Sequence, residues 1–222
     1  MSHESRWPWR RMLKEGVLIV GSVYVAIVLE GVSAQRARVA DARADLAQLR
    51  SELQADLADL AEIVGEQEEL AAQYARLLRW LATPEDMPND SVHAALERLA
   101  TSNRTLFPRR GAWTSLVSGG QLASLGDGAL VSRLANFYEN IVERLEYNGA
   151  SYDRNVDEVM RETVSASWDK SRRRPVGDAV RLRNDLAYLE LAWTRFYLDL
   201  LREHERESMG LLDDIAAFLH GT

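Results

Sequence analysis

The feature of this sequence that most constrains its fold is a long apolar stripe at helical spacing between residues 39 and 81. The stripe advances in alternating steps of three and four residues, as one face of an α-helix does. Its members are Val39, Ala42, Leu46, Leu49, Leu53, Leu57, Leu60, Val64, Gln67, Ala71, Tyr74, Leu78 and Leu81. Because this stretch contains no proline and a single glycine, the pattern predicts one helix from about residue 12 to residue 82.

Further apolar residues lie beside this stripe. Ile63, Leu70 and Leu77 follow one another at intervals of seven and widen the apolar face beyond what a two-stranded seam requires. We therefore expect the helix to pack against other helices of its own chain, with a parallel dimeric zipper as the alternative. The step from Leu53 to Leu57 is four residues where a heptad requires three, which predicts a stutter in the packing.

The motif TPEDMPND ends this helix, because its two prolines cannot continue an α-helix. Asp90 or Ser91 is then expected to cap a short helix over residues 92–102. Residues 103–126 are irregular, apart from two single helical turns.

Two aspartates are expected to cap two more long helices. Asp127 precedes apolar positions that repeat every eleven residues, which is typical of a nearly straight helix. The segment SRRRPVG (171–177) is a break, and Asp178 caps the last helix. The apolar stripe of that helix passes through a polar interval around His204, or the helix breaks near Gly210. No segment has the pattern of a strand.

The N-terminal residues predict a membrane anchor. Residues 16–29 carry no charge, and extension to residue 34 gives nineteen helical residues. Such a helix is about 28 Å long, enough to cross the hydrocarbon core of a bilayer. Glu30 then lies near one interface, where water makes a carboxylate tolerable. A buried core helix and a cleaved signal peptide are the alternatives.

The sequence thus predicts an all-α protein in three parts: a basic flank (1–15), a membrane-spanning helix (16–34) and a helical bundle domain (35–222). The spanning helix is expected to continue into an elongated bundle of three long helices plus one short helix. Lysine occurs only at Lys14 and Lys170, which hints at a GC-rich bacterial genome. A slight basic excess before the span favours a cytoplasmic N terminus in the bacterial inner membrane, with the bundle in the periplasm.

Composition excludes several kinds of function. The chain has no cysteine, and therefore no disulfide, thiolate metal site or cysteine nucleophile. Its formal net charge of −7 argues against general nucleic-acid binding. No nucleophile–base pair, metal set or cofactor fingerprint occurs in a local motif, so we expect no cofactor, no metal and no catalytic residue.

Two sets of charged residues are candidate contact sites. Glu30 is a carboxylate near membrane depth, which either ends the span or pairs with a basic group of another membrane protein. Arg172, Arg173 and Arg174 form a basic cluster between two helices. We interpret the cluster as a solvated loop or as a contact to lipid headgroups or an acidic partner.

Histidines and aromatic residues receive structural interpretations. His93 and Glu97 form an isolated pair four residues apart, and His204 lies among glutamates in what we interpret as a solvated charged stretch. The four histidines are too scattered for a zinc site. Trp113 and Trp168 are interpreted as packing residues of the core.

In each of two stretches of the sequence, an apolar or turn segment is followed by the pattern of a helix. One is KEGVLIVGSVYVAIVLEG followed by ARADLAQLRSELQADL, and the other is WTSLVSGGQLASLGDGALVSRLANFYENI. In these stretches the chain resembles a family of bacterial membrane-anchored all-helical proteins of unknown function. The resemblance implies membrane attachment and a helical domain, and it carries neither an activity nor functional residues.

The predicted function is that of a membrane-anchored helical scaffold or protein-interaction module, within a membrane assembly and without catalytic activity. Its expected partners are the lipid bilayer and either another protein or a second copy of the chain. The alternative is an extracytoplasmic ligand-sensing domain, since long helices continuous with a spanning helix can transmit a shift or rotation to a separate signalling partner.

Overall fold

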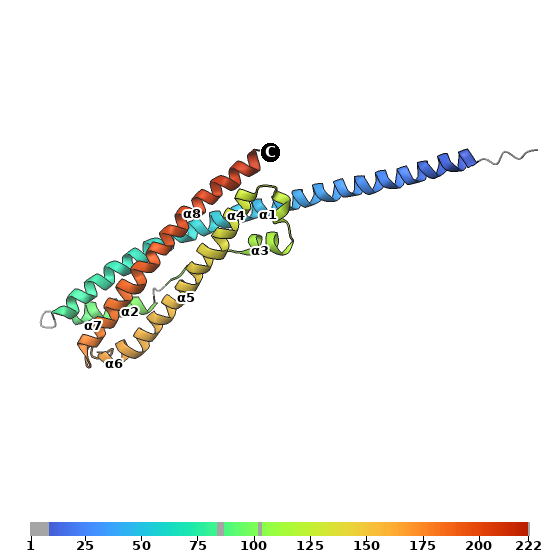
Figure 1. The fold of residues 1–222 in the computed structure, drawn as a ribbon. Helices are drawn as coiled ribbons and strands as arrows, with labels where there is room; N and C mark the ends of the chain where they lie inside the picture. Colours follow the sequence, from blue (N-terminus) through green and yellow to red (C-terminus); the bar gives the residue numbers. More distant parts are fainter. Residues whose placement is uncertain (1–8, 84–86, 102–103, 222) are drawn as a thin grey trace, which may run out of the picture.

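The first helix, α1 (Trp9–Ala82), is 74 residues long and begins well outside the bundle (Figure 1). In the computed structural model, residues 9–83, 87–101 and 104–221 are described, with the side chains of residues 9–17 and 19 excepted. The prediction of one unbroken helix from residue 12 to residue 82 is confirmed.

One face of α1 is buried along its C-terminal half in an unbroken heptad pattern. The predicted stutter after Leu53 is wrong, because Asp56 occupies the core position three residues later and is 1% exposed. A second polar residue, Gln67, occupies another core position and is fully buried. The buried positions of this heptad are Ala42, Leu46, Leu49, Leu53, Asp56, Leu60, Ile63, Gln67, Leu70, Tyr74, Leu77 and Leu81.

Short elements follow α1. Helix α2 (Asn89–Thr101) precedes the segment 104–110, which has no regular secondary structure. The helix α3 (Gly111–Ser118) and the 3₁₀ turn η2 (Leu122–Leu125) follow it. The expected cap of α2 is wrong by two or three residues, because the helix begins at Asn89. Asp90 and Ser91 lie inside its first turn, where the Val92 N–H donates to the Pro88 carbonyl oxygen at 2.9 Å.

Two more long helical segments complete the bundle, and each is interrupted by π-helical turns. The first consists of α4 (Gly128–Asn136), η3 (Phe137–Val142), α5 (Glu143–Glu158), η4 (Val159–Val164) and α6 (Ser165–Ser167). The second consists of α7 (Ala179–Tyr188), η5 (Leu189–Thr194) and α8 (Arg195–His220). The expected three long helices and one short helix are present, together with the additional short helix α3.

The aspartate caps of these two segments are confirmed. Asp127 accepts hydrogen bonds from the N–H groups of Ala129 and Leu130, both at 3.0 Å. Asp178 accepts from the N–H groups of Val180 and Arg181 in the same way. A break near Gly210 is wrong, because α8 continues to His220.

The expectation that no strand is present is also wrong. A short antiparallel hairpin joins the two long segments, with β1 (Trp168–Asp169) paired to β2 (Arg174–Pro175). Each strand has only two residues, so neither can display the alternation by which a strand is recognised in a sequence.

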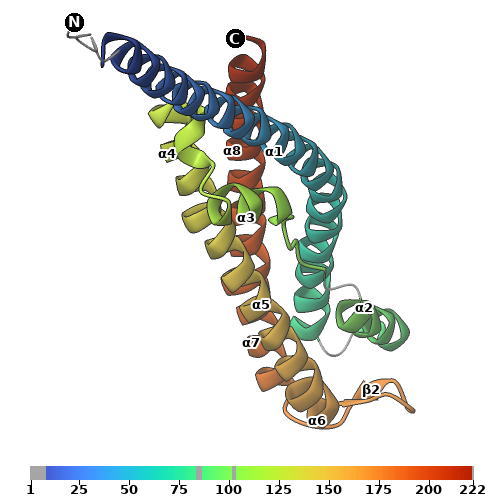
Figure 2. The same ribbon diagram turned by 90° about the vertical axis from the view of Figure 1, so that its right-hand side faces the viewer.

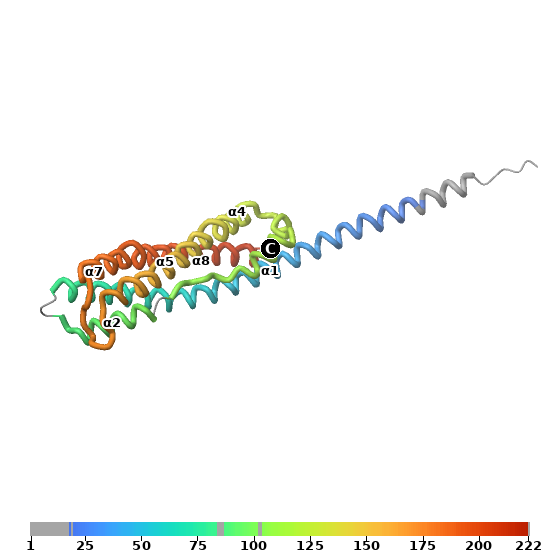
Figure 3. Tube along the Cα trace, turned by 90° about the horizontal axis from the view of Figure 1, so that it is seen from below, coloured from blue at the N-terminus to red at the C-terminus, as the bar shows by residue number. Residues whose placement is uncertain are grey.

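The elements give the bundle a defined direction. The segment α4–α6 runs parallel to α1, and α7–α8 returns antiparallel to them, so that the C terminus lies near the point where α1 leaves the bundle (Figures 1 and 3). One buried apolar cluster lies at this end and joins α1, α3, α4 and the last turns of α8. A second cluster lies at the far end, where α2 and the hairpin pack (Figure 2).

Polar contacts fasten segment 104–110 between the two clusters. Asp56 accepts from the Arg109 N–H at 3.0 Å and from its guanidinium at 2.6 Å. Gln67 donates to the Arg104 carbonyl oxygen at 2.8 Å, and the Tyr197 hydroxyl accepts from the Leu106 N–H at 2.8 Å. Asp56 and Gln67, the polar residues of the α1 heptad, thus hold the segment that leads back from α2 to α3.

Within the described residues, none of the helices contains a run that is both long and apolar enough to cross a membrane. The predicted span 16–34 lies partly outside these residues, because the side chains of residues 16, 17 and 19 are not described. Of the flank 1–15, residues 1–8 lie outside them, and the side chains of residues 9–15 are not described.

Candidate functional site

Helix α2 presents two faces, and only one of them packs against α1 and its neighbours. Its buried residues are Val92, Ala95, Leu96 and Leu99. The other face borders a cavity of about 440 Å³ between α2, η4 and the hairpin. The cavity is lined by His93, Leu96, Glu97, Arg98, Ala100, Thr101, Met160, Val164, Trp168 and Lys170.

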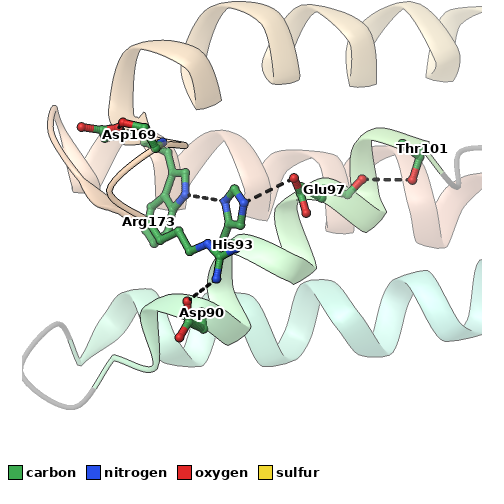
Figure 4. Close-up of polar contacts among 8 residues, drawn as sticks. Asp90, His93, Glu97, Thr101, Asp169 and Arg173 are labelled. Carbon is green, nitrogen blue, oxygen red and sulfur yellow. Dashed lines mark hydrogen bonds and ion pairs between the residues drawn. The ribbon is translucent and has the colours of Figure 1, made fainter.

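A chain of polar contacts crosses one end of this cavity (Figure 4). The indole N–H of Trp168 donates to His93 Nδ1 at 3.2 Å. His93 Nε2 lies 3.3 Å from a carboxylate oxygen of Glu97. Because Nδ1 accepts, Nε2 carries the proton of the neutral ring, and both nitrogens of His93 are engaged by protein groups.

The turn of the hairpin is organised by one carboxylate. Asp169 Oδ1 accepts hydrogen bonds from the Ser171 N–H at 2.9 Å, the Ser171 hydroxyl at 2.7 Å and the Arg172 N–H at 3.0 Å. These bonds stabilise the ionised form, and they lower the pKa of Asp169, with the Ser171 hydroxyl as the largest cause. Arg173 follows with a φ of 49°, in the left-handed region of backbone conformation that residues other than glycine rarely adopt.

Further contacts hold the hairpin against the ends of the neighbouring helices. Arg173 forms an ion pair with Asp90 in the first turn of α2 at 2.9 Å. The Val176 N–H donates to the Ser167 carbonyl oxygen at 3.1 Å. Gly177 is required by a close approach, since a Cβ atom there would lie 2.5 Å from the Ala166 carbonyl oxygen. The hairpin is therefore fixed where Trp168 and Lys170 border the cavity.

The four predicted contact residues lie at opposite ends of the molecule. Glu30 is exposed on the part of α1 that projects from the bundle. Arg172 and Arg173 lie in the hairpin turn, where Arg172 pairs with Asp169 at 3.6 Å. Arg174 begins β2 and pairs in register with Asp169. The arginines therefore lie in the hairpin, at the end of the bundle opposite the projecting part of α1 that carries Glu30 (Figure 1).

The sequence interpretation of this region is only partly right. Trp168 is a packing residue as expected, with 2% exposure, but its indole N–H also joins it to His93, 75 residues earlier. The one local signal was the spacing of His93 and Glu97. In the part of the chain that the structure describes, no group of three or more potential ligands is placed to hold a metal ion.

The interpretation of His204 as part of a solvated stretch is wrong. Its side chain is fully buried, and its ring centroid lies 5.1 Å from that of Phe137. Neither ring nitrogen has a hydrogen-bond partner among the described residues, and the same holds for the nearby Ser208 hydroxyl. Burial lowers the pKa of His204 to about 4.

The fold and the cavity define a class of protein: an all-α bundle built on one long projecting helix. The sequence pattern of a family of unknown function (DUF6090) matches residues 15–168. The match covers more than half of the chain, so the protein belongs to this family. Comparison with curated proteins finds no match. Comparison with solved structures finds none either.

Proposed function

We propose that this protein is a membrane-anchored helical scaffold, a non-catalytic domain that holds its bundle away from a bilayer and binds a partner there. The observation that carries the proposal is the apolar surface of α1 before it enters the bundle. Among the described side chains of this part of the helix, nine large apolar ones are exposed. They are Leu18, Val20, Val23, Tyr24, Val25, Ile27, Val28, Leu29 and Val32.

These side chains lie on several sides of the helix and do not form one stripe. At about 100° per residue, Leu18 and Ile27 point to opposite sides, and Tyr24 lies between them. A helix that is apolar on most sides is stable in a core or in lipid hydrocarbon. Large exposed apolar patches mark interaction sites, and the uncharged run that begins at residue 16 favours a bilayer over a protein groove.

The length of α1 beyond residue 34 supports an arrangement in which the far end of the bundle is held away from the bilayer. From residue 34 to its end, α1 extends over about 70 Å at 1.5 Å per residue. With 16–34 in the bilayer of a bacterial inner membrane and the N terminus in the cytoplasm, the hairpin arginines lie at the end of the bundle far from that bilayer. We therefore favour an acidic partner over lipid headgroups for Arg172 and Arg174, and Glu30 remains proposed as a contact to another membrane protein.

The test is alkaline carbonate extraction of membranes, with the full-length chain compared with a chain that begins at Gln35. The truncation removes no residue of the buried heptad, which begins at Ala42. We expect the full-length chain to stay in the membrane pellet, because its apolar segment remains in the hydrocarbon. The shorter chain is expected in the supernatant with its helical circular dichroism intact.

Substitutions make the test specific. Replacement of Val25 and Val28 by Arg places two charges at membrane depth, each costing about 2.5–3.5 kcal/mol, and is expected to release the full-length chain. Leu191→Arg is the matched control, since Leu191 is 67% exposed on η5 but lies in the bundle. Extraction of the unaltered full-length chain, or equal retention of all variants, would contradict membrane anchoring.

A second function, extracytoplasmic ligand sensing, is favoured by the cavity at the far end of the bundle. The cavity lies between α2, which packs beside the end of α1, and the hairpin that leads into the returning segment. Helix α1 is continuous from that region to the projecting segment. A displacement of α1 caused by a ligand in the cavity could therefore be transmitted along the helix to its other end. Output would require a separate signalling protein.

A further inference from the structure

The cavity between α2, η4 and the hairpin has the size and the lining of a ligand site. Its volume of about 440 Å³ falls within the range of small-molecule pockets. One helical face of α2 and the π-helical turn η4 form its apolar wall. The apolar lining consists of Leu96, Ala100, Met160, Val164 and Trp168.

Most of the polar groups at the cavity are already occupied. Both nitrogens of His93 and the indole N–H of Trp168 are used in the contact chain described above. The Thr101 hydroxyl donates to the Glu97 carbonyl oxygen at 3.0 Å. Neutral hydrogen-bond donors of the lining are therefore not free to hold a ligand.

The polar groups that remain are cationic. Lys170 forms no hydrogen bond or ion pair among the residues that the structure describes, and Arg98 has only a long contact of 3.9 Å to Glu69. Glu97, the one acidic residue of the lining, is engaged by His93 and directs a 65% exposed side chain toward solvent. The site is thus net positive on a protein whose formal charge is −7.

We propose that this cavity binds a small amphipathic carboxylate, whose apolar body packs on Leu96, Met160 and Val164 and whose carboxylate pairs with Lys170. Lys170 offers one flexible ammonium, and Arg98 is already in long contact with Glu69. Such a lining suits one carboxylate better than a phosphate, which usually requires several converging N–H groups. The inference rests on the sensing function proposed above. It is independent of membrane anchoring, because ligand binding and carbonate extraction are separate measurements.

The test uses the full-length chain in detergent micelles and the probe 3-(4-fluorophenyl)propionate, observed by ¹⁹F NMR. Its primary amide, which has the same shape without the charge, is the matched neutral probe, and empty micelles correct for partition. We expect submillimolar binding of the acid, about threefold to fivefold tighter than that of the amide, which is typical of a partly exposed charge pair.

Variants locate the binding. Lys170→Gln is expected to reduce the binding affinity of the acid to that of the amide and to leave the affinity of the amide unchanged. Arg172→Gln removes a cation from the same turn, but Arg172 does not line the cavity, so its effect is expected to stay below about twofold. Ala100→Phe places a ring at the cavity wall, where the exposed Ala100 leaves room, and is expected to exclude both probes.

Four outcomes would overturn the proposal. They are no binding of the acid at millimolar concentration, equal binding of acid and amide, equal losses in the Lys170 and Arg172 variants, and binding retained by Ala100→Phe, which would place the probe elsewhere. Lys170→Gln keeps the test valid even where Ala100→Phe fails to fold, because Lys170 lies in a turn and supports no other side chain.

Discussion

At the scale of single residues, the bundle contains a histidine in a position that makes its stability depend on pH. Burial lowers the pKa of His204 to about 4 from its ordinary value of 6.5. The unfolded chain therefore binds a proton at this residue between these values, and the folded chain does not. The contribution of His204 to the free energy of unfolding is therefore fully present above pH 6.5 and is lost as the pH decreases toward 4.

We predict that protonation linked to His204 alone lowers the free energy of unfolding of the wild type by about 2 kcal/mol when the pH is lowered from 7.5 to 5. The measurement is urea denaturation at both pH values for the wild type and for His204→Leu. Carboxylates contribute equally to both proteins, so the difference between the two pH slopes isolates the histidine. Identical slopes would mean that His204 is hydrated or paired in solution.

A second residue-scale prediction concerns Asp56, the carboxylate in the heptad of α1. Burial raises its pKa, which the hydrogen bonds from Arg109 only partly oppose. Asp56→Ala leaves the Arg109 N–H without its acceptor and is expected to cost about 2–3 kcal/mol in denaturant unfolding. Asp56→Asn keeps an acceptor without the buried charge and is expected to cost less.

Asp59 provides the matched control for Asp56. It contacts the same guanidinium at 2.9 Å, but its side chain is 45% exposed. Asp59→Ala is therefore expected to cost less than about 1 kcal/mol, as exposed ion pairs do. Similar losses from the two alanine variants would show that the segment 104–110 is not held by the buried carboxylate.

At the scale of elements, the hairpin and α2 are joined by a hydrogen bond whose energy can be isolated. Trp168→Phe retains an aromatic ring but removes both the donor to His93 and part of the buried ring system, so we predict a loss of about 1 kcal/mol from the hydrogen bond in addition to lost packing. Trp193→Phe makes the same chemical change where the indole N–H has no partner among the described residues. Chemical denaturation is expected to show a smaller loss for Trp193→Phe, and equal losses would contradict the hydrogen bond.

The elements also show which parts of this fold are readable in a sequence. The caps at Asp127 and Asp178 and the ends of α1 depend on neighbouring residues, and local patterns predicted them. The π-helical turns add a residue to a turn only where tertiary packing favours it, and no local signal marked them. The eleven-residue repeat after Asp127 therefore predicted a regular helix in place of one with two such turns.

The candidate site was less predictable than the fold. Trp168 and His93 are 75 residues apart and meet because a two-residue strand turns the chain at Asp169. Asp56 was overlooked because a search for apolar residues skips a carboxylate, although the heptad required a core residue there. Sequence periodicity reveals which face of a helix is buried, whereas polar contacts between distant elements require the tertiary structure.

At the scale of the whole molecule, the proposed anchor and the hairpin are separated by most of the length of α1. A bundle that stands away from the bilayer keeps the hairpin about 70 Å from the end of the span. A bundle that lies flat would bring Arg172 and Arg174 to the lipid headgroups. The two arrangements have the same helices and differ only in where the ends lie relative to lipid.

Because the chain has no cysteine, single fluorescent labels distinguish these arrangements. We predict that headgroup-quenching lipids in nanodiscs quench a label on Arg36→Cys and leave a label on Arg172→Cys unchanged, since contact quenching does not act over such a distance. Quenching of both labels would place the bundle on the bilayer and favour lipid as the partner of the arginines. Quenching of neither would contradict the anchor itself, because residue 36 lies two residues beyond the proposed span.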